Sequence, residues 1–152
     1  MNIHFKLHQH PKPLQHLDFL ARVYTRISMV LAGAEDIFVE DLHTAAFAYA
    51  FQGGFHEPNH PQHGKIHFGR SYANKGILFQ TSVIIHEAAH LVDAKIGHFA
   101  SELPPPAGTP VDSRKNYVQL NFKEASHNAY TYAQFAMHAL HNFDKRIVPF
   151  GE

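Results

Sequence analysis

The residue types and spacing best suited to chemistry lie in His86-Glu87-Ala88-Ala89-His90. Residues four apart on an α-helix lie on one face, so both imidazoles can bind a single tetrahedral metal ion. Glu87 would then lie beside the metal, where a carboxylate can act as general base on a bound water. The pattern predicts a zinc-dependent hydrolase, and peptide bonds are its expected substrate.

A second match to the same pattern shows why the surrounding residues matter in a chain with 15 histidines. It is His56-Glu57-Pro58-Asn59-His60, and glycines and prolines surround it over residues 53–64. These residues break a helix, and without a helix the two rings are not aimed at one point. We interpret this stretch as a surface loop. Residues 77–96, by contrast, contain neither Pro nor Gly.

A catalytic zinc site has three protein ligands and a water, so a third ligand must lie elsewhere in the chain. Glu124 is the first candidate, because it lies early in a predicted helix with Asn128 one turn later. Asn128 could hydrogen-bond a ligand imidazole and orient it. The competing interpretation of Glu124 is a solvated carboxylate near a helix N-terminus, where the helix dipole favours it.

Three other residues remain candidates for the third ligand. Asp112 follows Gly108-Thr109-Pro110-Val111 and equally suits a helix cap. Asp93 falls within about 20° of His86 around the helix, and it is better placed to support a ligand histidine than to bind the metal. His98 follows Gly97, which could turn the chain back toward the site.

Polar side chains near Glu124 are candidates for stabilising the oxyanion that forms when water attacks a carbonyl. His127 and Tyr132 lie close to the Glu124 face of the predicted helix, and Tyr130 lies further round. For any one tyrosine, packing in the core with a satisfied hydroxyl is the competing interpretation.

The elements that would position these residues predict an α+β fold in a single domain, residues 1–152. Ile3, Phe5 and Leu7 alternate with polar residues and predict a strand, while 44–51 fits either a helix or a strand. We expect helices over 14–32, 75–96 and 117–143, strands over 37–39 and 65–69, helix stops at Gly33 and Gly97, and a Pro-rich loop over 102–110.

Composition limits the partners and the compartment. The formal net charge is zero and no basic stretch occurs, so we expect no nucleic-acid partner. There is no Cys, so a metal must use His, Asp or Glu. The N-terminus has no signal-peptide pattern and no run of 18 apolar residues occurs, so we expect no membrane span. A cytoplasmic protein, or one exported without a signal peptide, fits these features. Nothing in the sequence indicates an oligomeric state.

Two segments resemble zincin metallopeptidases. Residues 84–90, Ile-Ile-His-Glu-Ala-Ala-His, and residues 125–136, Ala-Ser-His-Asn-Ala-Tyr-Thr-Tyr-Ala-Gln-Phe-Ala, are similar to segments of the aspzincins, the deuterolysin and lysine-specific endopeptidase group. The resemblance covers residues 66–136. It implies a zincin-like fold and a zinc metalloendopeptidase activity, with residues 66–69 as an edge strand that holds an extended substrate.

The chain also departs from the aspzincin pattern. That group takes an Asp ligand from a G-T-x-x-D-x-x-Y-G motif, whereas here Tyr117 is displaced after Asp112 and no Gly follows it. Glu124 with Asn128 is more similar to the gluzincin arrangement, in which Glu is the ligand. Small cysteine-free domains of this kind also occur as toxins of bacterial secretion systems, which implies an effector role by analogy.

The sequence therefore predicts a zinc metallopeptidase in which Glu87 activates water and then passes the proton to the leaving amine. A rival hypothesis is a non-catalytic, His-rich module that binds metal loosely or serves in interactions. A third hypothesis is a structural domain in which His86 and His90 are core residues.

Overall fold

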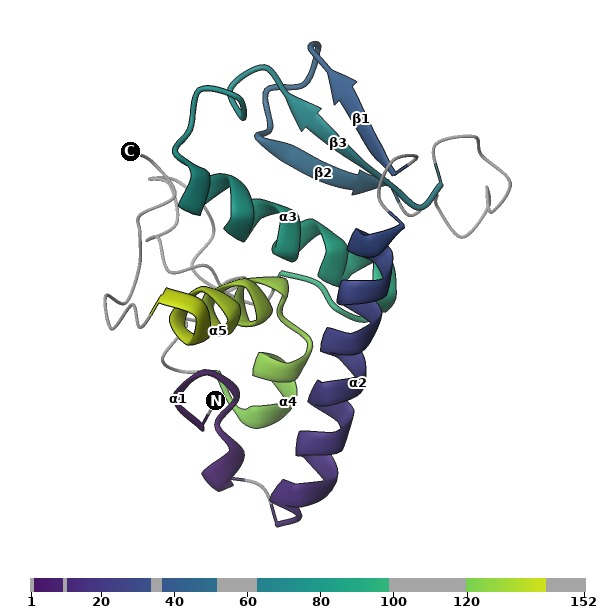
Figure 1. The fold of residues 1–152 in the computed structure, drawn as a ribbon. Coiled ribbons are helices and arrows are strands. Elements are labelled where there is room, and N and C mark those ends of the chain that lie inside the picture. Colours follow the sequence, from purple (N-terminus) through teal and green to yellow (C-terminus); the bar gives the residue numbers. More distant parts are fainter. Residues whose placement is uncertain (1, 10, 34–36, 52–62, 99–119, 142–152) are drawn as a thin grey trace, which may run out of the picture.

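The protein is an α+β domain with a small sheet at one end and helices beneath it (Figure 1). The computed structural model describes residues 2–9, 11–33, 37–51, 63–98 and 120–141. Its elements are α1 (Asn2–Phe5), a 3₁₀ turn (Leu7–Gln9), α2 (Pro13–Ala32), β1 (Phe38–Asp41), β2 (Ala48–Phe51), β3 (Lys65–Gly69), α3 (Ile77–Val92), α4 (Phe122–Ser126) and α5 (Ala129–His141). The predicted α+β class is confirmed.

The described sheet has the strand order β1-β3-β2, so β3 is its central strand. β3 runs parallel to β1 and antiparallel to β2, with His67 opposite Val39 on one side and Tyr49 on the other. The expectation that residues 66–69 form an edge strand is therefore wrong. Ile66 is fully buried and His67 nearly so, which suits a strand with neighbours on both sides and both faces covered. β2 is the edge strand that contacts α3.

α3 lies between the sheet and the other long helices (Figure 1). It contacts β2 and β3 on one side and α2 and α5 on the other. Ala88 and Ala89 are fully buried on this helix, and their small side chains let neighbouring helices approach closely. Core residues on the helical side include Phe5, Leu20 and Tyr132, all without exposed surface. A helix surrounded in this way is held rigidly, which suits a helix that carries a binding site.

The N-terminal segment is helical where alternation predicted a strand. Phe5 ends α1, and its ring packs edge-on against Tyr132 at 5.1 Å between centroids. Lys6 adopts a positive φ of 53°, which separates α1 from the turn that buries Leu7. The backbone therefore changes direction between Phe5 and Leu7, and both side chains are buried. Alternation of apolar and polar residues in the sequence cannot distinguish this arrangement from a strand.

Both helices near the predicted site differ from the sequence prediction: one ends early and the other is interrupted. α3 ends at Val92, and Asp93 is extended (φ −153°, ψ 115°), so Gly97 is not the helix stop. The predicted helix over 117–143 is interrupted at His127 and Asn128, which separate α4 from α5. The same contact accounts for both differences, because Gly97 and Asn128 form a parallel β-bridge between the two segments.

The other expectations agree closely with the described elements. The helix over 14–32 and its stop at Gly33 are confirmed, as is the strand over 65–69. The ambiguous stretch 44–51 contains β2. Gly69 ends β3 where the backbone of Ala46 passes so close that a Cβ atom would overlap it. The loop over 102–110 and most of 53–64 lie outside the described residues.

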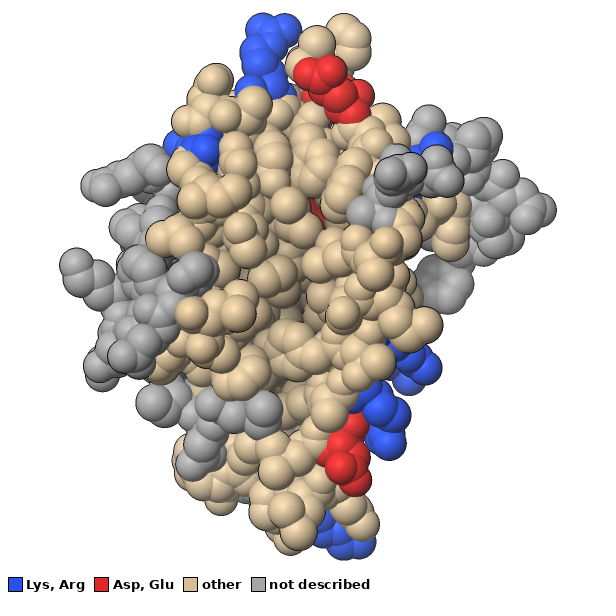
Figure 2. Space-filling model, in the orientation of Figure 1, with Lys and Arg blue, Asp and Glu red and all other residues tan. Residues whose placement is uncertain are grey.

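The surface in this view carries its charges near its two ends. Figure 2 shows Lys, Arg, Asp and Glu side chains at the top and toward the lower right, with an uncharged surface over the middle. None of the described helices is long and apolar enough to cross a membrane.

Candidate metal centre

Three histidines from one continuous stretch of chain converge on a single point. His86 and His90 lie on α3, one turn apart, and His98 lies six residues beyond the end of the helix. The Nε2 atom of His86 lies 2.7 Å from that of His98 and 3.2 Å from that of His90, and the His90–His98 distance is 2.9 Å. This group could hold a metal ion.

Hydrogen bonding alone does not satisfy three imidazole nitrogens that face one another. A neutral Nε2 atom carries either a hydrogen or a lone pair. With three atoms and two states, at least two atoms share the same state, and two like groups about 3 Å apart repel. A cation at the centre removes the conflict, because it accepts a lone pair from each ring.

The size of the triangle fits a first-row metal ion. A tetrahedral zinc ion bound at 2.0–2.1 Å separates its nitrogen ligands by roughly 3.3–3.4 Å. The observed separations of 2.7–3.2 Å lie a few tenths of an ångström below this. Small side-chain rotations would therefore open the triangle enough to admit the ion.

The other ring nitrogens show how two of the imidazoles are oriented. The Nδ1–H of His90 donates to the carbonyl oxygen of Ile96 at 2.7 Å, which leaves Nε2 with its lone pair toward the centre. A carbonyl partner of this kind is typical of a metal-binding histidine. The Nδ1 atom of His86 is buried and has no hydrogen-bond partner within the described part of the chain.

The turn after α3 brings the third histidine to the other two. The Asp93 carboxylate accepts the N–H of Lys95 at 2.9 Å, and the Ile96 N–H donates to the Asp93 carbonyl at 2.9 Å. These bonds reverse the chain immediately beyond the helix. Ile96 is then buried with 1% of its surface exposed, which anchors the turn.

Two backbone hydrogen bonds hold the residue that precedes His98. The Gly97 N–H donates to the carbonyl oxygen of His127 at 2.8 Å, and the Ala129 N–H donates to that of Gly97 at 3.0 Å. The junction between α4 and α5 therefore fixes the backbone beside His98. The third histidine depends on residues about 30 positions further along the chain.

Burial favours the neutral form of His86 and His90. Desolvation lowers the pKa of His86 well below its ordinary value, and the neighbouring His90 and His98 lower it further. Desolvation also lowers the pKa of His90, against a smaller opposing effect of the Ile96 carbonyl. Neutral rings are the form that binds a metal ion, so the lowered pKa of His86 and of His90 favours metal binding.

Glu87 follows His86 on α3 and is buried against the sheet. It has 8% of its surface exposed, and its carboxylate accepts a hydrogen bond from the backbone of Ala50 on β2. Burial raises the pKa of Glu87 to about 7, and the Ala50 bond opposes this rise. The edge strand β2 thus orients the Glu87 carboxylate.

Tyr130 forms an aromatic wall of the site. Its ring lies edge-on to His86, with centroids 4.3 Å apart, and it is tilted against His98 at 5.6 Å. It lies in the first turn of α5 and is half-buried. In a single long helix, Tyr130 would lie further round from Glu124 than His127 and Tyr132 do, so the sequence favoured those two residues.

The structure changes the order of the third-ligand candidates. Among the described residues, His98 is the one that joins His86 and His90. Glu124 is instead engaged in a capping box, in which its carboxylate accepts the Asn121 N–H and its own N–H donates to the Asn121 side chain, each at 3.0 Å. The competing interpretation, a carboxylate near a helix N-terminus, agrees with this position, and the capping box itself was not predicted.

Two further candidate ligands are accounted for differently. Asp93 is not part of the cluster, and its carboxylate caps the turn that leads to His98. Its supporting role therefore acts through the backbone and not through a bond to a histidine ring. Asp112 and Tyr117 lie outside the described residues.

Two of the residues expected to stabilise an oxyanion, His127 and Tyr132, do not lie in the cluster, whereas Tyr130 contacts it. Tyr132 is fully buried, and its hydroxyl donates to the carbonyl oxygen of Ser126 at 2.8 Å, so the core-packing interpretation holds. The Nδ1–H of His127 donates to the Lys123 carbonyl at 2.8 Å. Asn128 contributes its backbone to the bridge with Gly97, while its side chain donates to Thr131 at 3.1 Å.

A comparison with models of protein families, with curated proteins and with solved structures finds no significant match for this chain. The site must therefore be interpreted from its own residues.

Proposed function

We propose that the protein is a zinc-dependent metallopeptidase of zincin type, in which His86, His90 and His98 bind the metal and Glu87 is the general base. The observation that carries the proposal is the convergence of three Nε2 atoms, two of them from the helix that also carries the buried Glu87. Three histidine ligands leave a fourth position open, as catalytic zinc sites require. The nitrogen-only ligand set and its tight spacing favour zinc over calcium or magnesium, which prefer oxygen.

A zinc ion in this site would supply a Lewis acid that lowers the pKa of water and polarises a carbonyl group. The three histidines orient that ion, and the Ile96 carbonyl fixes the tautomer of His90. Glu87 accepts the proton of the attacking water and transfers it to the leaving amine. The Ala50 N–H limits the motion of the Glu87 carboxylate while this happens.

The edge strand β2 offers a means of binding an extended peptide. It pairs with β3 on one side only within the described sheet, and Ala50 on this strand touches the general base. A peptide that added to the free side of β2 would run beside Glu87 and place a backbone carbonyl near the histidines. Backbone pairing of this kind selects unfolded or flexible substrates.

The experiment compares Glu87→Gln with the wild-type protein. Zinc content is measured by mass spectrometry, and cleavage is followed on a quenched fluorescent peptide library and on unfolded casein. We expect Glu87→Gln to bind one zinc per chain and to lose about 10²–10⁴-fold in cleavage rate, the range for loss of a general base.

Glu124→Gln is the matched control, because it changes the same functional group at a helix cap away from the cluster. It should cleave at the wild-type rate. Full activity in Glu87→Gln would contradict the mechanism. A zinc-loaded wild-type protein that cleaves neither the library nor casein would instead favour a non-catalytic metal module.

A further inference from the structure

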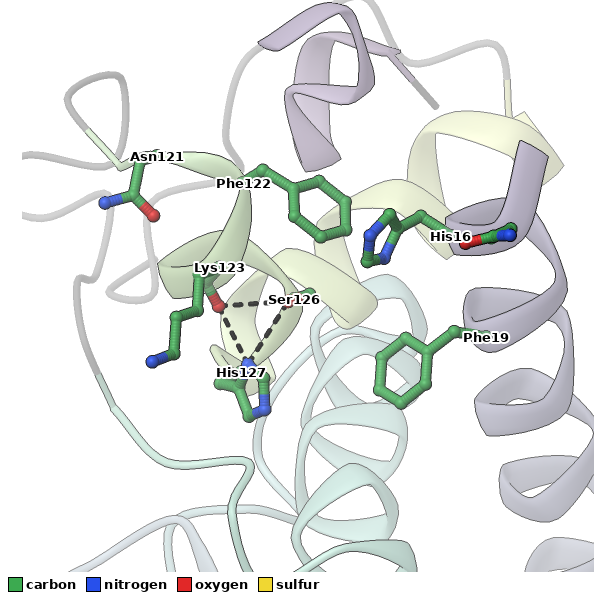
Figure 3. A pocket seen from close by; sticks show the side chains of 8 residues that line it. His16, Phe19, Asn121, Phe122, Lys123, Ser126 and His127 are labelled. Carbon is green, nitrogen blue, oxygen red and sulfur yellow. Dashed lines mark hydrogen bonds between the residues drawn. The ribbon is translucent and has the colours of Figure 1, made fainter. Parts of the chain in front are cut away.

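A second cavity, separate from the histidine cluster, lies between α2 and α4 (Figure 3). Its volume is about 550 Å³, enough for a small organic molecule. None of its eight lining residues is a member of the histidine cluster or is Glu87. The proposed hydrolysis assigns it no role.

The cavity walls are aromatic on both sides. Figure 3 shows the rings of Phe19 and His127 on opposite walls, with Phe122 and His16 closing the space above them. The planes of Phe19 and His127 are within 28° of parallel, and their centroids are 6.4 Å apart. A planar ring in contact with both faces needs about 7 Å, twice a 3.5 Å contact. A small side-chain movement would therefore admit one flat ring.

His127 and Phe122 are held firmly in their positions. The Nδ1 atom of His127 is engaged by the Lys123 carbonyl, and the His16 ring packs edge-on to Phe122 at 4.1 Å between centroids. Phe122 is buried with 8% of its surface exposed. Rigid walls reduce the entropy that binding would otherwise cost.

The one charged side chain that lines the cavity is basic, which favours an anionic ligand. Lys123 is the only lysine or arginine among the lining residues, and no carboxylate is among them. Figure 3 shows its side chain on the same wall as His127. A ring bound between Phe19 and His127 that carried a carboxylate would have Lys123 on the adjoining wall, and no carboxylate is among the lining residues.

We propose that this cavity is a binding site for a planar aromatic carboxylate, with the ring between Phe19 and His127 and the carboxylate paired with Lys123. The site binds its ligand independently of the metal, so the proposal does not rest on the hydrolytic function.

The test is a titration of the ¹⁵N-labelled full chain with 2-naphthoate and with 2-naphthamide, its uncharged counterpart, followed by NMR. We expect a dissociation constant of roughly 0.1–1 mM for the acid. The shift changes should centre on residues 15–19 and 121–127. An exposed ion pair contributes little, so the acid should bind about three- to fivefold more tightly than the amide.

Two variants separate the contributions of charge and ring. Lys123→Met should remove the preference for the acid, while Arg26→Met, at an exposed position further along α2, should retain it. Phe19→Leu keeps apolar bulk but removes the ring, and it should weaken both ligands about tenfold. Equal affinity of wild-type protein for acid and amide would overturn the proposal.

A carboxylate could also bind a metal ion, so His98→Ala is titrated in parallel. The cavity proposal predicts that this variant binds 2-naphthoate as tightly as the wild type. Shift changes centred on residues 86–98, together with loss of binding in His98→Ala, would show that the acid sits on the metal and would overturn the cavity site.

Discussion

At the scale of single residues, the main result is the exchange of Glu124 for His98 in the candidate metal site. Glu124 closes a capping box with Asn121, and its two hydrogen bonds leave it directed at its own helix. His98 lies 2.7–2.9 Å from the other two histidines through its Nε2 atom. The candidate ligand set changes from two histidines and a carboxylate to three histidines.

Substitution of these two residues should affect metal binding differently. His98→Ala removes one of three ligands and should weaken zinc binding by at least about 100-fold, beyond the 10–100-fold typical of a residue that only supports a ligand. Glu124→Gln should keep wild-type affinity and lose roughly 1 kcal/mol of stability from the cap. Competition with a fluorescent zinc chelator measures the affinities. Tight zinc binding in His98→Ala would show that another residue completes the site.

At the scale of elements, the metal site depends on a contact between two chain segments and not on α3 alone. α3 supplies two ligands with the spacing of one helical turn. The third comes from a turn that is fixed by backbone hydrogen bonds to His127 and Ala129 at the α4–α5 junction. The interruption between α4 and α5 therefore helps to position His98.

Gly97 allows this contact to be tested with a matched pair of substitutions. Gly97→Pro removes the N–H that donates to His127 and should weaken zinc binding by about 10–100-fold, the usual effect of losing support behind a ligand. Gly97→Ala is the control, because no atom lies within 4 Å of the added Cβ and both backbone bonds remain. If the two variants bind zinc equally well, the bridge does not control His98.

The junction of α1 with α5 contains a second histidine pair with a different property. The His4 and His138 rings are joined by a 3.0 Å contact between Nε2 and Nδ1, and their centroids are 5.2 Å apart. Burial lowers the pKa of His4 to about 4, with smaller contributions from His138 and Lys6. His4 thus stays neutral in the folded protein at pH values where the unfolded chain is protonated.

Because of this pair, we expect the folded protein to lose stability in acid. Between about pH 6.5 and pH 4 the unfolded state binds more protons at His4 than the folded state, so stability falls as the pH falls. We expect this residue to contribute a loss on the order of 2 kcal/mol between pH 7 and pH 4. Urea unfolding of wild type and His4→Gln across this range measures the difference. A variant that matches the wild-type pH dependence would contradict the prediction, and His8→Gln, at an exposed site nearby, is the control.

At the scale of the whole molecule, a metal ion would add a link between segments that backbone hydrogen bonds already join. The cluster joins α3 to the chain beyond it, and that chain is bound in turn to the α4–α5 junction. An ion that binds the folded state alone stabilises it in proportion to its saturation. Metal and fold should therefore be coupled in this protein.

Removal of the metal should lower the melting temperature. Zinc at about 1,000 times its dissociation constant stabilises a fold by about 4 kcal/mol, which is roughly 10 °C for a domain of this size. Scanning calorimetry with and without a chelator measures the shift, and His98→Ala should show almost none. An unchanged melting temperature of the wild type after complete chelation would instead support a structural role for the histidines.

The sequence predicted some elements of the fold, such as α3, better than others, such as the N-terminal segment. The central helix, the strand over 65–69 and the pair of His86 and His90 follow from local periodicity and breaker residues, which act over a few positions. The strand expected at Ile3–Leu7 failed, because alternating burial also arises when a short helix and a turn bury one side chain each. Local patterns carry no information about the partner that buries them.

The sequence by itself determined the helix that carries His86, Glu87 and His90, and the absence of thiol ligands. Only the tertiary structure decided the third histidine, the central position of β3 and the place of Tyr130 against His86. The physical reason is the range of the interactions. His86 and His90 are brought together by hydrogen bonds within one helix, whereas His98 is held by backbone bonds to residues about 30 positions away, which form only when the chain folds as a whole.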